Sequence, residues 1–140
     1  MKKIYKATLA TLFLSTFIGT SLSANDITKL DVKNECNVKA NGIKKVLATA
    51  SKYNIIAKKE GVEFKRLGMT NTQYIDGTMK AITEGSKTVD IVNAKNKKTG
   101  EVSTEYAAWR ACSFAISALQ QKEEAKTTWK LAMPGNGFEY

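Results

Sequence analysis

Hydrophobic residues recur along residues 35–52 at steps of three and four positions, which is the repeat of an α-helix with one apolar face. The members of this apolar stripe are Cys36, Ala40, Ile43, Leu47 and Ala50. Asn34 is a suitable N-cap, and Gly42 weakens the middle of the segment. We expect the helix to continue beyond residue 52 until Gly61 ends it, which makes it the first long helix of the chain.

A second periodic segment covers residues 105–122 and predicts the last long helix. Its apolar stripe consists of Trp109, Cys112, Ile116 and Leu119. Alanines at positions 108 and 115 leave room for a neighbouring element to approach closely. The spacing therefore places Trp109 in the hydrophobic core.

The segment between these two helices begins with shorter elements. Alternation of apolar and charged residues over 62–67 predicts a half-exposed strand. Asn71 or Thr72 then caps a further helix, which Gly85 closes. The apolar residues of that helix are Ile75, Met79 and Ile82.

A β-hairpin is expected next, followed by a strand at the end of the chain. Residues 89–92 and 102–104 predict two strands, and the polar residues 96–100 predict the turn between them. We expect residues 127–133 to form an edge strand, because they hold Trp129 and Leu131 between polar neighbours.

These elements together predict an α+β fold in which two or three helices pack on a small antiparallel sheet. An all-α bundle is the alternative, and in that fold residues 89–104 form a long loop.

The first 24 residues have the layout of a cleavable secretory signal peptide. Three lysines precede an uncharged, mostly apolar run over 7–22, and small residues follow it. That run is shorter than the roughly 20 residues that span a bilayer, so we expect cleavage rather than anchoring. The cut follows Ser23 or Ala24, with Ala24 preferred, and leaves residues 25–140 as one domain without a membrane span. The layout is typical of bacteria and predicts a periplasmic or secreted protein.

The chain is basic, with 22 lysine and arginine residues against 13 acidic ones and a net charge of +9. Removing the lysines of the signal peptide leaves 19 basic and 13 acidic residues, a net charge of +6. Such a charge favours anionic partners. Nucleic acid is not among those we expect, because the chain has only two arginines, Arg66 and Arg110, and no aromatic residues interleaved with its basic ones.

Cys36 and Cys112 are the only cysteines, and both lie beyond the predicted cleavage site. An even number of cysteines in an oxidising compartment predicts a disulfide. Each cysteine lies on the apolar stripe of a predicted long helix, so the bond is expected to join the first and last long helices inside the core.

The chemistry available to the chain is narrow because it contains no histidine. Histidine is the commonest general base and a usual zinc ligand, so its absence favours a non-catalytic role and we expect no metal and no cofactor. Carboxylate pairs remain possible acid–base groups. The pairs that could share a helix face are Asp31 with Glu35 and Glu101 with Glu105, and a looser group is Asp76, Glu84 and Asp90.

Aromatic residues near the C-terminus are the binding candidates, because aromatic side chains dominate binding hot spots. They are Trp129, Phe138 and Tyr140. They form a binding patch if they stay exposed, and the alternative is that they fold back and pack onto the sheet. The leading hypothesis is an exported, non-catalytic accessory protein of the bacterial envelope whose basic surface binds an anionic polymer or a protein partner. The alternative is a small hydrolase that uses carboxylates on an envelope polymer.

Overall fold

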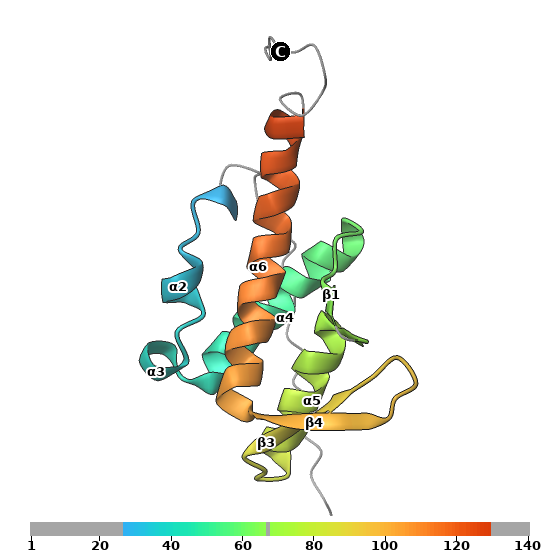
Figure 1. Ribbon diagram of the computed structural model, residues 1–140. Helices are drawn as coiled ribbons and strands as arrows, with labels where there is room; N and C mark the ends of the chain where they lie inside the picture. The colour runs from blue at the N-terminus through green and yellow to red at the C-terminus, as the bar shows by residue number, and fades with distance from the viewer. Residues whose placement is uncertain (1–26, 67, 130–140) are drawn as a thin grey trace, which may run out of the picture.

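The computed structural model describes residues 27–66 and 68–129 of the chain, in which helices surround a central α6 and two short hairpins lie beside them (Figure 1). The predicted signal peptide, together with Phe138 and Tyr140, lies outside the described residues. No helix in the described part is both long and apolar enough to cross a membrane.

The core forms where α6 (Thr104–Thr128) packs against α4 (Ile43–Lys59) and α5 (Asn71–Thr83). Small side chains on α6 allow the close approach that the sequence predicted, because Ala108 and Ala115 are fully or almost fully buried. The larger buried residues that surround them include Val46, Leu47, Tyr74, Ile75, Ile116 and Leu119.

The first predicted helix is divided in the structure, so the prediction of one helix beginning at residue 35 was wrong. A four-residue helix, α2 (Val32–Glu35), ends at Cys36, and a second one, α3 (Val38–Asn41), follows. Gly42 then separates α3 from α4, because its φ of 77° and ψ of 147° are not helical.

The two short helices have their own caps, which explains why the chain breaks there. The Asp31 side chain accepts a hydrogen bond from the Asn34 N–H, so Asp31 rather than Asn34 is the first N-cap. The Asn37 side chain accepts one from the Ala40 N–H and begins α3. The end of the long helix was predicted correctly, since α4 stops at Lys59, two residues before Gly61.

The predicted disulfide is present between Cys36 and Cys112, with the two Cα atoms 5.6 Å apart and both residues fully buried. It joins the C-cap of the short α2 to α6, not the first long helix to the last, because the chain breaks before α4 begins. Its presence indicates a chain that folds outside the reducing cytoplasm.

The strand predicted over 62–67 is much shorter. Only β1 (Lys65–Arg66) forms, and it pairs antiparallel with β2 (Met69–Thr70). Thr70 then caps α5 one residue earlier than predicted. A capping box explains this start: the Gln73 N–H donates to the Thr70 hydroxyl, and the Thr70 N–H donates to the Gln73 side chain.

The second hairpin is confirmed and is longer than predicted. β3 (Thr88–Val92) pairs antiparallel with β4 (Lys98–Ser103), with Val89 opposite Val102. It leads directly into α6, whose N-terminus is capped by the Ser103 hydroxyl. The two hairpins beside the helices confirm the α+β class.

The edge strand predicted over 127–133 is wrong where the structure describes it. Thr127 and Thr128 continue α6, which is six residues longer at its C-terminal end than predicted. A lysine ion pair stabilises this extension, because Lys126 Nζ lies 2.7 Å from Glu123 Oε1 one turn earlier.

Candidate functional site

Exposed aromatic rings gather at the N-terminal end of α6. Tyr106 and Trp109 are 44% and 43% exposed, and their ring centroids lie 5.5 Å apart. The two residues are three positions apart on one helix, so both side chains project to the same side. The prediction that Trp109 belongs to the core was therefore wrong.

These rings border a groove of about 410 Å³ between α6 and the short N-terminal helices, which lie along one side of α6 in Figure 1. We call it the aromatic groove. One wall comes from the α2–α3 segment and the other from the beginning of α6. Its lining residues are Lys33, Asn37, Val38, Lys39, Ser103, Glu105, Tyr106 and Trp109.

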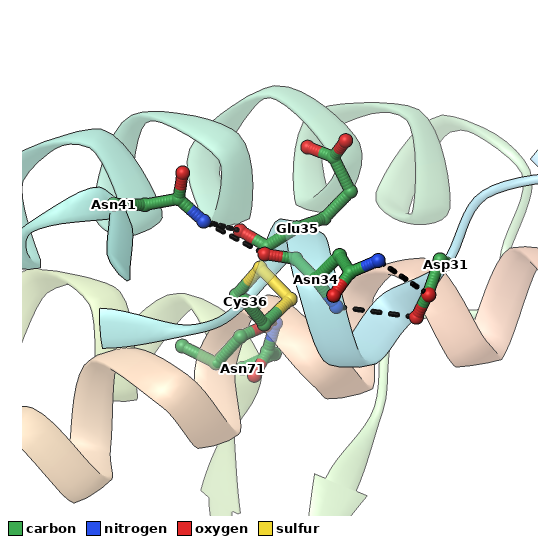
Figure 2. Close-up of a disulfide and its surroundings, with 8 residues drawn as sticks. Asp31, Asn34, Glu35, Cys36, Asn41 and Asn71 are labelled. Carbon is green, nitrogen blue, oxygen red and sulfur yellow. Dashed lines mark hydrogen bonds between the residues drawn. A yellow bond between two sulfur atoms is a disulfide. The ribbon is translucent and has the colours of Figure 1, made fainter. Parts of the chain in front are cut away.

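The α2–α3 wall is held in place by the disulfide and by amide hydrogen bonds. Figure 2 shows the Asn41 amide pointing at the carbonyl oxygens of Asn34 and Glu35, beside the disulfide of Cys36. Its Nδ2 atom lies 2.7 Å from the Asn34 oxygen. Cys36 is the one fully buried residue of this segment, and together with the partly buried Val32 and Val38 it ties the wall to the core.

The charge of the aromatic groove is positive. Lys33 and Lys39 line it, and neither forms an ion pair with a carboxylate of the described chain. Glu105 is the single acidic residue of the lining. The lysine side chains are thus available to attract carboxylate or phosphate groups beside the two rings.

Trp129, which the sequence analysis named as a binding candidate, lies far from the aromatic groove. Trp129 is 51% exposed but lies twenty residues beyond Trp109, about 30 Å along the helix axis. Phe138 and Tyr140 fall outside the described residues. The sequence analysis overlooked Tyr106, although its spacing of three from Trp109 on a predicted helix is the signal that pairs them.

A second cavity, of about 370 Å³, lies between α5 and β3 and brings together the acidic group considered from the sequence. Asp76, Glu84 and Asp90 all line it. Lysines accompany two of these carboxylates: Lys98 Nζ lies 2.8 Å from Asp90 Oδ1, and Lys80 Nζ lies 3.9 Å from Glu84 Oε1. Nowhere in the described chain do three potential metal ligands cluster.

The two carboxylate pairs proposed from helical spacing have other roles. Asp31 caps α2 through hydrogen bonds with Asn34, while Glu35 is the last residue of that helix. Glu101 lies on β4 and Glu105 on α6, so they do not share a helix face as the sequence suggested.

Among the described residues, three carboxyl groups have shifted pKa values, and all three shifts are downward. Hydrogen bonds from Lys122 and Lys98 lower the pKa of Glu60 and of Glu101 respectively. Burial raises the pKa of Glu63, but hydrogen bonds from Thr72 and Asn54 outweigh this effect and lower the pKa. A general acid requires the opposite shift, so none of these three groups is suited to protonate a leaving group at neutral pH.

No protein-family model, curated protein or solved structure matches this chain. The fold and the two cavities are therefore the basis for a functional conclusion.

Proposed function

We propose that this chain is an exported, non-catalytic binding protein of the bacterial envelope that holds an anionic glycan polymer in the aromatic groove. In this proposal the rings of Tyr106 and Trp109 stack on the apolar faces of sugar rings. Lys33 and Lys39 attract the carboxylate or phosphate groups of the polymer.

The observation that carries the proposal is that two exposed rings line one groove with two lysines that pair with no carboxylate among residues 27–66 and 68–129. Burying these rings against a ligand would remove apolar surface from water, so their exposure in the free protein is a cost that a ligand relieves. The groove is also preorganised, since the Cys36–Cys112 disulfide fixes one wall against the other.

The expected cellular location and the net charge of the protein support the same proposal. The predicted signal peptide and the disulfide agree with a periplasmic or secreted protein, where envelope polymers are the abundant anions. The predicted mature charge of +6 gives the whole surface a positive field that draws such polymers toward it.

The test compares two tryptophans of the same helix. We expect Trp109→Ala to weaken retention of the purified, oxidised protein on peptidoglycan by about tenfold or more, because an exposed tryptophan in a binding groove acts as a hot spot. Trp129→Ala is the matched control, since that residue is at least as exposed (51% against 43%) but lies outside the aromatic groove. Equal weakening by the two variants, or by Trp129→Ala alone, would refute the assignment of this groove.

The charge contribution is tested with paired lysine variants. Lys33→Gln combined with Lys39→Gln should weaken binding at low salt and reduce its salt dependence. Lys95→Gln combined with Lys97→Gln removes the same charge from the exposed hairpin turn, away from the aromatic groove. A larger loss from this second pair would show that general charge, not the groove, retains the polymer.

The alternative of a carboxylate hydrolase places its chemistry in the cavity of Asp76, Glu84 and Asp90. Lysines lie beside two of its carboxylates, with Lys80 Nζ 3.9 Å from Glu84 Oε1 and Lys98 Nζ 2.8 Å from Asp90 Oδ1. Release of soluble fragments from peptidoglycan that Asp76→Asn abolishes would establish this alternative instead.

A further inference from the structure

A separate apolar groove runs between α4 and α5. It consists of two adjoining hollows of about 300 and 220 Å³, which share Ser51 and Met79 as lining residues. Leu47 and Ile82 line the first hollow, and Ile55 lines the second. We call these hollows together the α4–α5 groove.

The α4–α5 groove exposes large apolar side chains that the core does not use. Ile55 is 57% exposed and Met79 is 51% exposed, although the sequence pattern placed Met79 on the apolar stripe of its helix. The α4 residues that line the groove extend from Lys44 to Lys58, which is about 20 Å along the helix. A helix of about 13 residues has this length.

The charge beside the α4–α5 groove is one-sided. α4 carries five lysines and no acidic residue, and none of these lysines forms an ion pair with a described carboxylate. Lys44 and Lys58 line the two ends of the groove. Asp76 is the single acidic residue of the lining.

We infer that the α4–α5 groove docks an acidic amphipathic helix of a partner protein. The apolar stripe of that helix covers Leu47, Met79 and Ile55, while aspartate or glutamate residues on its flanks pair with the lysines of α4. Apolar anchors at helical spacing inside a groove, with complementary charge at the rim, are how amphipathic helices are recognised. This inference does not depend on the aromatic groove, because the two grooves share no lining residue.

A second copy of the same chain is a poorer occupant. A symmetric dimer through this face would place α4 beside α4, because a two-fold interface uses the same patch on both subunits. Lys44 and Lys58 of each copy, which line the groove, would then lie at one interface, and like charges across an interface oppose association.

The experiment uses two synthetic peptides of 14 residues with leucines at steps of three and four positions. One peptide carries glutamates on its flanks and the other carries lysines at the same positions. The protein is labelled with ¹³C at its methionine methyl groups, so that Met79 reports on the α4–α5 groove and the buried Met69 serves as an internal reference. We expect the acidic peptide to shift the Met79 signal and leave Met69 unchanged, and the basic peptide to shift neither.

Variants then test which contacts produce the binding. Met79→Ala combined with Ile55→Ala should weaken binding of the acidic peptide at least tenfold. Lys44→Gln combined with Lys58→Gln should abolish the preference for the acidic peptide over the basic one. Tyr106→Ala combined with Trp109→Ala is the control in the aromatic groove and should leave peptide binding unchanged.

Three results would overturn the inference. The first is equal binding of the two peptides, and the second is the absence of any Met79 shift. The third is a concentration-dependent dimer in sedimentation that Met79→Ala abolishes, because a second copy would then occupy the groove.

Discussion

Glu63 shows how a single side chain connects several segments of this fold. Its Oε1 atom accepts hydrogen bonds from the Thr72 N–H at 2.8 Å, from the Thr72 hydroxyl and from the Asn54 amide. Asn54 in turn accepts from Asn71, whose amide also donates to the Ala111 carbonyl of α6 at 2.8 Å. One carboxylate thus begins a polar network that reaches α4, α5 and α6.

This network predicts a pH-dependent stability. Burial alone would raise the pKa of Glu63, but hydrogen bonds from Thr72 and Asn54 favour the carboxylate more strongly and lower the pKa. A lowered pKa in the folded state gives stability that is present above the unfolded pKa of roughly 4.3 and is lost as the pH falls through the folded pKa. Urea unfolding should therefore show that Glu63→Gln destabilises the protein at pH 7 and that the difference shrinks toward pH 3.

The control for this prediction is Glu124→Gln at the exposed end of α6, which should change the free energy of unfolding little at either pH. A Glu63→Gln difference that is constant between pH 7 and pH 3 would contradict the proposed role of the charge.

At this scale the sequence could not decide which side chains α6 buries. Helical spacing placed Trp109 inside, yet the neighbouring Arg110 is 7% exposed and Trp109 is not buried. The guanidinium carbon of Arg110 lies 4.3 Å from the ring centroid of Tyr74 and 5.0 Å from that of Phe114. Because α6 packs on both α4 and α5, its buried face is broader than the predicted stripe. Cys112, Ile116 and Leu119 are buried as predicted, and Ala107, Arg110 and Ala111 are buried with them.

At the scale of elements, the predictions succeeded where local chemistry decides the structure. Ser103 caps α6 within two residues of the predicted start, and the polar turn before residue 100 connects the predicted hairpin strands. The prediction of one continuous first helix failed because the apolar repeat continues across the break between α2 and α3. Cys36 and Val38 still face the core although they belong to different segments. Periodicity alone cannot detect a break that preserves the apolar face.

Gly42 produces a second break, between α3 and α4, and its backbone conformation predicts a measurable cost of substitution. A φ of 77° with a ψ of 147° is a conformation that only glycine adopts readily. Apart from Gly42 and its two chain neighbours, no heavy atom of the described residues lies within 4 Å of where an alanine Cβ would sit. The expected loss for Gly42→Ala, about 1–3 kcal/mol, therefore comes from the backbone alone. Chemical denaturation measures it.

Gly100→Ala is the matched control, because a Cβ there also meets open space and the residue has no positive φ. It should change the free energy of unfolding by less than about 0.5 kcal/mol. A more stable Gly42→Ala protein would instead mean that α3 and α4 can join into the continuous helix that the sequence pattern predicted.

At the scale of the whole molecule, the disulfide both stabilises the fold and positions one wall of the aromatic groove. α2 and α3 have four residues each, which is far too short for a helix to be stable on its own. The bond from Cys36 to Cys112 holds this segment on α6 and thereby positions Lys33 and Lys39 beside the exposed rings. The α4–α5 groove has no such dependence, because both of its walls are long helices packed in the core.

Breaking the disulfide should therefore have two separable effects. The bond spans 76 residues, so its loss restores unfolded-state entropy worth about 4 kcal/mol and should lower the melting temperature by roughly 15 °C or more. In Cys36→Ser combined with Cys112→Ser, studied at a temperature where the protein is still folded, polymer binding should fall with the loss of the α2–α3 wall. Binding of the acidic peptide in the α4–α5 groove should persist.

Reductant should reproduce the melting curve of the double variant and leave the variant itself unaffected. An unchanged melting curve in reductant, or two thiols that react with an alkylating agent before reduction, would show that the bond does not stabilise the protein in solution.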